Sequence, residues 1–191
     1  MWTMIALGLA TAQANPPMTD DAVLARMTAL FDNICLKTFP ADDAVAATMN
    51  ALGAVPRTRE QLKIYLHDDP GRGWIVADGE KKFTVTIEAP PYHACTVRRA
   101  TPNGFADLAP LEAVLGPYER VAGGFAKMHP ADMQIGQIAS HVVGEQKTTQ
   151  DGGGEAFYVF SNSVSDPAER AKGYTGVEVR FVHQFTAPGA R

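Results

Sequence analysis

The sequence predicts an α+β fold, in which N-terminal helices precede a mostly antiparallel sheet of about six strands that a kinked helix interrupts. Three observations predict it. Between residues 19 and 66, apolar residues recur at three- and four-residue intervals, the spacing of one helical face. Residues 83–88 alternate between apolar and polar side chains, which is typical of a strand with one buried face. A second helical stretch, residues 105–125, then separates the early strands from the late ones.

Three helices are expected before the first strand. The first follows Thr19, whose hydroxyl suits a helix N-cap, and the second starts at Asp42 and ends before Gly53. The third starts with Thr58-Arg59-Glu60-Gln61, a capping box that satisfies two backbone donors. Their core faces are predicted to be Val23, Leu24, Met27, Leu30 and Phe31 in the first helix, Val45, Met49 and Leu52 in the second, and Leu62, Tyr65 and Leu66 in the third.

Three strands are expected next. Proline and two glycines impose a turn on residues 68–73, so the first strand should begin at Trp74. After the Asp78-Gly79 turn, the alternation predicts a half-buried hairpin, and residues 93–99 form a third strand with Cys95 inward. The predicted core side chains of the hairpin are Phe83, Val85 and Ile87, and the predicted solvated ones are Thr84, Thr86 and Glu88.

The second half of the chain predicts one more helical region and three more strands. Gly116-Pro117 interrupts the helical pattern of residues 105–125, because proline lacks a backbone donor and clashes with the preceding turn. Two short helices or one strongly kinked helix are therefore expected. Residues 134–147, 156–161 and 176–186 are predicted strands, joined by a hairpin loop at 148–154 and a longer connection at 166–173.

The N-terminus has the pattern of a secretory signal. An apolar run at residues 4–10 precedes the small-residue pattern Ala12-Gln13-Ala14. We expect residues 1–14 to be a signal peptide and residues 15–191 to be a single α+β domain. The first residues lack the Lys or Arg with which a signal usually begins, so an ordinary N-terminal helix is the alternative.

The chain has two cysteines, Cys35 and Cys95, each in an apolar segment. In an oxidising compartment, a disulfide between them would close a loop of about 60 residues and stabilise the fold by about 4 kcal/mol. The even count and the signal pattern both favour this bond and a periplasmic or secreted location. The alternative is two separate buried thiols in a reducing compartment.

Composition excludes several classes of partner. The net charge is −4 and no Lys or Arg cluster follows a phosphate backbone, so nucleic acid is not an expected partner. No apolar run reaches the ~18 residues of a transmembrane helix. None of the five histidines has a metal-ligand spacing, and no cofactor motif is present. His67-Asp68-Asp69 would suit a divalent cation, but such a trio also occurs as a solvated turn, and we predict neither metal nor cofactor.

Four residues are candidates for ligand binding. His183 alternates with Val179 and Phe181 and should therefore point into the core, and His141 shares the apolar side of its own strand. On neighbouring strands, two inward histidines would form a pocket. The alternative is that each is a core histidine with its hydrogen bonds satisfied. Arg72 and Trp74 would be presented to a ligand by the loop Gly71-Arg72-Gly73-Trp74.

No catalytic residue can be assigned from the sequence. Ser140 and His141 are adjacent and therefore point to opposite faces of their strand. His93 and Cys95 share one strand face, but a disulfide would remove that thiolate. The Gly-x-Ser-x-Gly motif of serine hydrolases does not occur.

Three segments together resemble a loose group of small exported bacterial proteins that have no assigned activity. They are Cys35-Leu36-Lys37-Thr38-Phe39-Pro40, Gly71-Arg72-Gly73-Trp74 and Tyr92-His93-Ala94-Cys95. The resemblance covers residues 20–100. It implies export and a paired cysteine, and no catalytic residues.

These patterns leave three functional hypotheses. The first is an exported binding domain without catalytic activity, which contacts a protein or another cell-envelope component through its sheet or loops. The second is a small hydrolase or ligand-binding enzyme that uses the inward histidines. The third is a subunit of a larger envelope assembly, which the edge strands of the sheet suggest.

Overall fold

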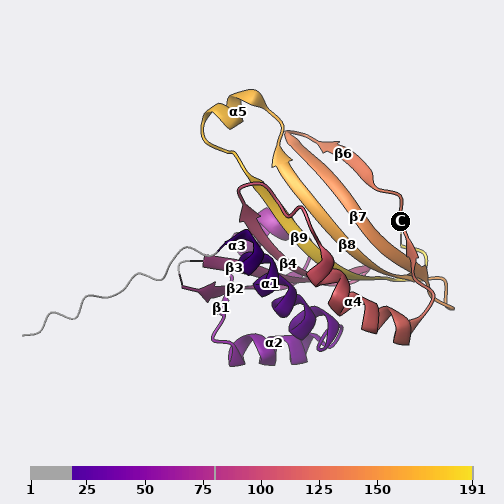
Figure 1. Cartoon of the computed structure of the whole chain (residues 1–191). Coiled ribbons are helices and arrows are strands. Elements are labelled where there is room, and N and C mark those ends of the chain that lie inside the picture. Colours follow the sequence, from indigo (N-terminus) through magenta and orange to yellow (C-terminus); the bar gives the residue numbers. More distant parts are fainter. Residues whose placement is uncertain (1–18, 80, 191) are drawn as a thin grey trace, which may run out of the picture.

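The computed structural model describes residues 19–79 and 81–190, so the predicted signal peptide, residues 1–14, lies outside the described residues. The described part of the chain confirms the α+β fold with its antiparallel sheet (Figure 1). Nine strands within it form one sheet in the order β1-β2-β3-β4-β9-β8-β7-β5, and β6 also pairs with β7. Among residues 19–79 and 81–190, no helix combines the length and apolar character needed to cross a membrane.

The elements have the following bounds. The helices are α1 (Asp20–Phe31), α2 (Asp42–Ala51), α3 (Arg59–Leu66), α4 (Ala109–Ala122) and α5 (Pro167–Ala171), and a short π-helix, η1 (Asp32–Leu36), continues α1. The strands are β1 (Val55–Pro56), β2 (Gly71–Asp78), β3 (Lys81–Glu88), β4 (Tyr92–Thr101), β5 (Ala126–Lys127), β6 (Ala131–Ile135), β7 (Ile138–Thr148), β8 (Gly154–Val164) and β9 (Val177–Thr186).

The strand count exceeds the predicted six for local reasons. The single strand predicted at residues 134–147 is a hairpin of β6 and β7, which turns at Gly136 with a φ of 58°. Glycine adopts this left-handed conformation without steric cost, so it allows the reversal. The other additional strands, β1 and β5, are only two residues long and carry no alternation that a sequence pattern would reveal.

The N-terminal helices start where the capping residues predict. Thr19 Oγ1 accepts a hydrogen bond from the backbone N–H of Ala22, and α1 buries every residue of its predicted core face. The capping box of α3 is formed between Thr58 and Gln61. The prediction for Leu52 is wrong, because this residue ends α2 as its C-cap and is exposed.

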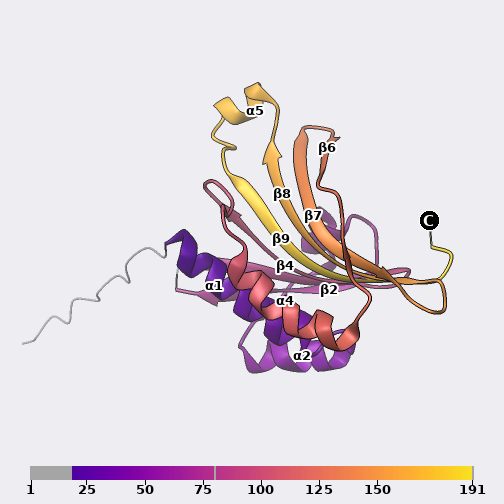
Figure 2. The same ribbon diagram turned by 45° about the vertical axis from the view of Figure 1, so that its right-hand side comes forward.

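Helices cover both faces of the first half of the sheet. Figure 2 shows α1, α2 and α4 together on one side, where they bury the predicted core residues of β3. On the opposite face α3 lies close to β2, because a Cβ on Gly73 would stand 2.5 Å from Leu62 Cδ2. A Cβ on Gly71 would stand 2.5 Å from Leu66 Cδ1. Strand β2 begins at Gly71 and not, as predicted, at Trp74, so both glycines are part of the strand. The absence of their side chains allows α3 to pack closely.

The position of α3 also overturns the predicted solvated face of β3. Thr84 and Thr86 are buried, and a Cβ on Gly73 would meet both Leu62 of α3 and Thr86. Alternation along β3 correctly separated the two faces. The alternation did not reveal that α3 covers the polar face of β3, because the position of α3 is set by its contact with β2.

The second half of the sheet consists of longer strands with fewer helices around them. One helix, α4, passes through Pro117 where two short helices or a strongly kinked one were expected. The strands β7 and β8 form the predicted hairpin, with Thr148 paired to Gly154 across its loop. In Figure 1, β7, β8 and β9 extend upward beyond α4 and end near α5. Every residue of β6 is exposed, so this half presents much of its surface to solvent.

Candidate functional site

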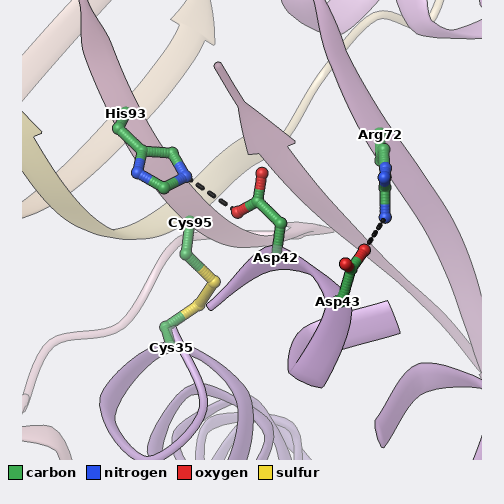
Figure 3. Close-up of polar contacts among 6 residues, drawn as sticks. All are labelled: Cys35, Asp42, Asp43, Arg72, His93 and Cys95. Atoms are coloured by element: carbon green, nitrogen blue, oxygen red, sulfur yellow. Dashed lines mark hydrogen bonds and ion pairs between the residues drawn. A yellow bond between two sulfur atoms is a disulfide. The ribbon is translucent and has the colours of Figure 1, made fainter. Parts of the chain in front are cut away.

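The predicted disulfide is present. Cys35 of η1 and Cys95 of β4 are bonded, with their Cα atoms 5.5 Å apart and both side chains fully buried (Figure 3). The bond therefore joins the N-terminal helical segment to the centre of the sheet. It also removes the thiolate that a His93–Cys95 pair would need, so this pair provides no nucleophile.

Two polar contacts beside the disulfide attach the start of α2 to the sheet. In Figure 3, Asp42 and Asp43 extend from the first turn of α2 toward His93 and Arg72. His93 Nε2 lies 2.8 Å from Asp42 Oδ1, and Arg72 NH1 donates a 3.1 Å hydrogen bond to Asp43 Oδ1. Arg72, a predicted ligand-binding residue, thus contacts α2.

Trp74, the other predicted ligand-binding residue of the segment Gly71-Arg72-Gly73-Trp74, is buried in the hydrophobic core.

His183 points into the core, as the alternation along its strand predicts. Its Nδ1 lies 2.7 Å from the carbonyl oxygen of Cys35, and its Nε2 lies 2.9 Å from Glu155 Oε1. A carbonyl oxygen and a carboxylate both accept hydrogen bonds, so each ring nitrogen of His183 lies beside an acceptor.

Glu155 is the centre of this buried network. Tyr118 OH donates to its Oε1 at 2.6 Å, and Lys147 Nζ lies 2.7 Å from its Oε2. Burial raises the pKa of Glu155, but the hydrogen bonds from His183, Lys147 and Tyr118 outweigh burial and lower this pKa to about 2. Burial, followed by the contact with Glu155, raises the pKa of Tyr118. The network connects α4, β7, β8 and β9 to η1.

Aromatic side chains enclose the remaining surface of His183. The rings of Phe39, Phe157 and Phe185 have centroids between 4.5 and 5.5 Å from that of the imidazole. The side chain of His183 is 0% exposed. His183 therefore contacts only protein atoms in this conformation.

His141, the other candidate histidine, lies apart from His183. It belongs to β7 and is separated from β9 by β8, so the prediction of neighbouring strands is wrong. Its side chain is 51% exposed, and its Nδ1 lies 2.7 Å from Asp132 Oδ1 of β6. Ser161 of β8 lies in register with it, but the described residues include no hydrogen bond between Ser161 and His141. The four predicted ligand-binding residues do not form one pocket.

A wide groove lies on the α3 side of the sheet, and none of the four predicted ligand-binding residues lines it. It has a volume of about 1130 Å³ and lies between α3, β6 to β9 and the segment before β9. The large apolar side chains that line it are between 37% and 70% exposed, namely Ile64, Ile135, Ile138 and Tyr174. They come from elements that are far apart in the sequence, so no local motif indicated this groove.

The charged residues around the groove are mostly basic. Lys81, Arg99 and Arg180 line it, and among the described lining residues the one carboxylate is that of Glu178, which pairs with Arg180. Arg98 lies directly across from Arg180 in the strand register and is only 4% exposed. Burial, followed by repulsion from Arg180, lowers the pKa of Arg98 to about 10. The groove therefore carries a local excess of positive charge on a chain whose net charge is −4.

Arg98 is held in place by few polar contacts. Its NH2 donates to Thr86 Oγ1 at 3.1 Å and its guanidinium lies 4.7 Å from the centre of the Tyr65 ring. Its Nε and NH1 are buried without a hydrogen-bond partner among the described residues. A guanidinium has five N–H groups, so most of the donor capacity of Arg98 is unused.

Comparisons of the chain with protein-family models, with curated proteins and with solved structures find no match. Within residues 19–79 and 81–190, no group of three or more His, Cys, Asp or Glu side chains is arranged to hold a metal ion.

Proposed function

We propose that this chain is a binding domain without catalytic activity, located in the periplasm or outside the cell, which holds an acidic, partly apolar segment of a partner protein in the groove on the α3 side of its sheet. One observation carries the proposal. Of the eight large hydrophobic side chains that are exposed among the described residues, four line this groove: Ile64, Ile135, Ile138 and Tyr174.

The gathering of these side chains is what distinguishes the groove from ordinary surface. Single exposed hydrophobic residues are common on proteins and need no explanation, whereas a contiguous apolar patch surrounded by polar groups is typical of an interaction site. Water leaves such a patch when a partner covers it, which supplies binding free energy. The lining of the groove reaches from Ile64 of α3 to Ile135 of β6.

The charge of the groove supports an acidic partner. Lys81, Arg99 and Arg180 line the groove against one carboxylate, that of Glu178, which pairs with Arg180. Of these cations, Arg99 also donates to the carbonyl oxygen of Lys82 and lies over the ring of Phe83. Complementary charge increases the rate of association and selects the partner more than it increases affinity. Binding of an acidic segment should therefore weaken as salt is added.

Two further observations support the location and the absence of catalysis. The buried Cys35–Cys95 bond is of a kind that forms and persists in oxidising compartments. The enclosed imidazole of His183 and the separate, exposed imidazole of His141 support binding over hydrolysis.

The groove can be tested by site-specific photo-crosslinking in the cells that make the protein. The full chain carries p-benzoylphenylalanine in place of Ile135 or Tyr174. The controls carry it outside the groove, in place of Val55, which is as exposed as these two residues, or of the more exposed Val121. We expect one discrete protein adduct from the two groove positions only. Adducts of equal yield from all four positions, or an adduct whose mass is that of a second copy of this chain, would overturn the proposal.

A binding assay tests the charge of the partner independently. Fluorescence anisotropy compares a peptide of alternating Asp and Leu with its Lys and Leu counterpart. We expect the acidic peptide to bind more tightly, to weaken with salt, and to lose affinity with Arg180→Glu but not with Arg120→Glu on α4. Equal binding of the two peptides would contradict the proposal.

A further inference from the structure

We infer a second binding site, for a small molecule that combines an apolar body with a protonated amine, in the cavity between α4 and the strands β7 to β9. This site is separate from the groove described above and does not depend on its function. It involves none of the residues that the sequence patterns singled out as ligand-binding candidates.

The cavity has the size and lining of a small-molecule site. Its volume is about 320 Å³, and ligand pockets usually measure about 300 to 1,000 Å³. Aromatic and aliphatic side chains dominate its walls, among them Phe31, Leu111, Leu115, Val143, Phe157 and Phe181. Side chains next to an unfilled cavity lack contact partners, so an apolar ligand would gain both dispersion contacts and release of water.

Neighbouring contacts hold the cavity open. The hydrogen bond from Tyr118 to Glu155 fixes α4 over β8, and the ring of Phe157 packs edge-on against Tyr118 at 5.3 Å. On its other side Phe157 contacts His183. The buried network around Glu155 therefore supports one wall of the cavity. If α4 moved closer to the sheet and closed the cavity, the hydrogen bond between Tyr118 and Glu155 would break.

Carboxylates dominate the charged edge of the cavity. The charged residues that line it are Glu112, Lys127 and Glu145. Lys127 Nζ lies 4.0 Å from Glu145 Oε1, which is too far for a hydrogen bond, and the side chain of Lys127 is mostly exposed. Glu119, two helical turns after Glu112 on α4, lies on the same helical face as Glu112.

Glu119 does not line the cavity itself, but it lies against Glu145, which does, and Lys127 is the cation near both. Glu119 Oε1 is buried and has no hydrogen-bond donor among the described residues. Burial, followed by repulsion from Glu145, raises the pKa of Glu119. An ammonium group between the two would supply the missing donors and relieve the repulsion. A carboxylate ligand would add to the repulsion, and a neutral ligand would leave it in place.

Three probes of matched shape test the inference on the full chain. Isothermal titration calorimetry and backbone amide NMR compare 2-phenylethylamine, 2-phenylethanol and phenylacetate. We expect the amine to bind about tenfold more tightly than the alcohol, which is the effect of one hydrogen bond to a charged group, and phenylacetate to bind most weakly. The amide shifts should be confined to the elements that line the cavity, chiefly α4, β7, β8 and β9.

Two variants separate the head group from the cavity. Glu145→Gln should remove the preference for the amine and leave 2-phenylethanol binding unchanged, which also shows that the variant is folded. Val143→Phe fills the cavity and should abolish binding of all three probes, while Glu169→Gln on α5 is the matched charge control. The inference is overturned if no probe binds saturably, if phenylacetate binds as tightly as the amine, or if Glu145→Gln and Glu169→Gln have equal effects.

Discussion

The two halves of the sheet differ in how completely helices cover them. In β3, the five residues from Phe83 to Ile87 are all buried, because α1 and α2 lie on one face and α3 on the other. In β6, every residue is exposed, and most of β8 is only partly buried. The covered half provides the core, and the uncovered half leaves both the groove and the cavity beneath α4 available to ligands.

The two halves meet at a covalent and a polar link. Cys95 of β4 and His183 of β9 are register partners, and both reach η1, the first through the disulfide and the second through the carbonyl oxygen of Cys35. Stability should therefore depend on this junction and on the covered half far more than on the open half.

The largest effect is expected from removing the disulfide. Replacing both Cys35 and Cys95 by alanine should lower the free energy of unfolding by about 4 kcal/mol, because the unfolded chain regains the freedom of a long loop. Urea denaturation followed by circular dichroism measures it. A loss below about 1 kcal/mol would mean that noncovalent contacts hold the junction without the bond.

Breaking the buried charge network should cost nearly as much. Glu155→Gln leaves the ammonium group of Lys147 without its carboxylate, and removal of one partner of a buried pair costs about 3 kcal/mol or more. Glu178→Gln, which breaks a half-exposed pair with Arg180, is the control and should cost less than about 1 kcal/mol. Equal losses in the two variants would mean that the buried network around Glu155 stabilises the fold no more than a surface ion pair does.

The same carboxylate should give stability a dependence on acid pH. The pKa of Glu155 is lowered from its ordinary value of 4.5 to about 2 in the folded protein, so its contribution is complete above the unfolded value. It is lost as pH falls from 4.5 toward 2. Stability measured against pH should decline over this window in the wild type and less steeply in Glu155→Gln; parallel curves would contradict the assignment.

A smaller loss is expected where α3 contacts β2. Gly73→Ala places a Cβ 2.5 Å from Leu62 Cδ2 and should cost about 2 kcal/mol through overpacking. Gly116→Ala in α4 is the control, since the nearest atom to its Cβ is the flexible tip of Arg120 and alanine favours helix by about 1 kcal/mol. A neutral Gly73→Ala would show that α3 moves freely over the sheet.

The smallest effect belongs to the open half. His141→Ala removes an exposed pair with Asp132 and should change the free energy of unfolding by less than about 0.5 kcal/mol. His183→Ala, its buried counterpart, should cost several times more. If the two losses were equal, the distinction between the halves would fail.

Local patterns determined much of this protein. Thr19 and the Thr58–Gln61 capping box fix two helix starts, and the alternation in residues 83–88 separates the two faces of β3, because these signals act within a few residues. The inward direction of His183 follows from the same alternation. The pairing of Cys35 with Cys95 was predictable because only one intramolecular pairing of two cysteines exists.

Only the tertiary structure decided what those elements meet. Thr86 is buried because α3 packs across β2, and Glu155 becomes the partner of His183 through the pairing of β8 with β9. The groove joins Ile64 to Tyr174, and the cavity joins Leu115 to Val143, across long stretches of chain. Periodicity states which way a side chain points, whereas its neighbours depend on strand order and helix placement, which are set by the free energy of the whole fold.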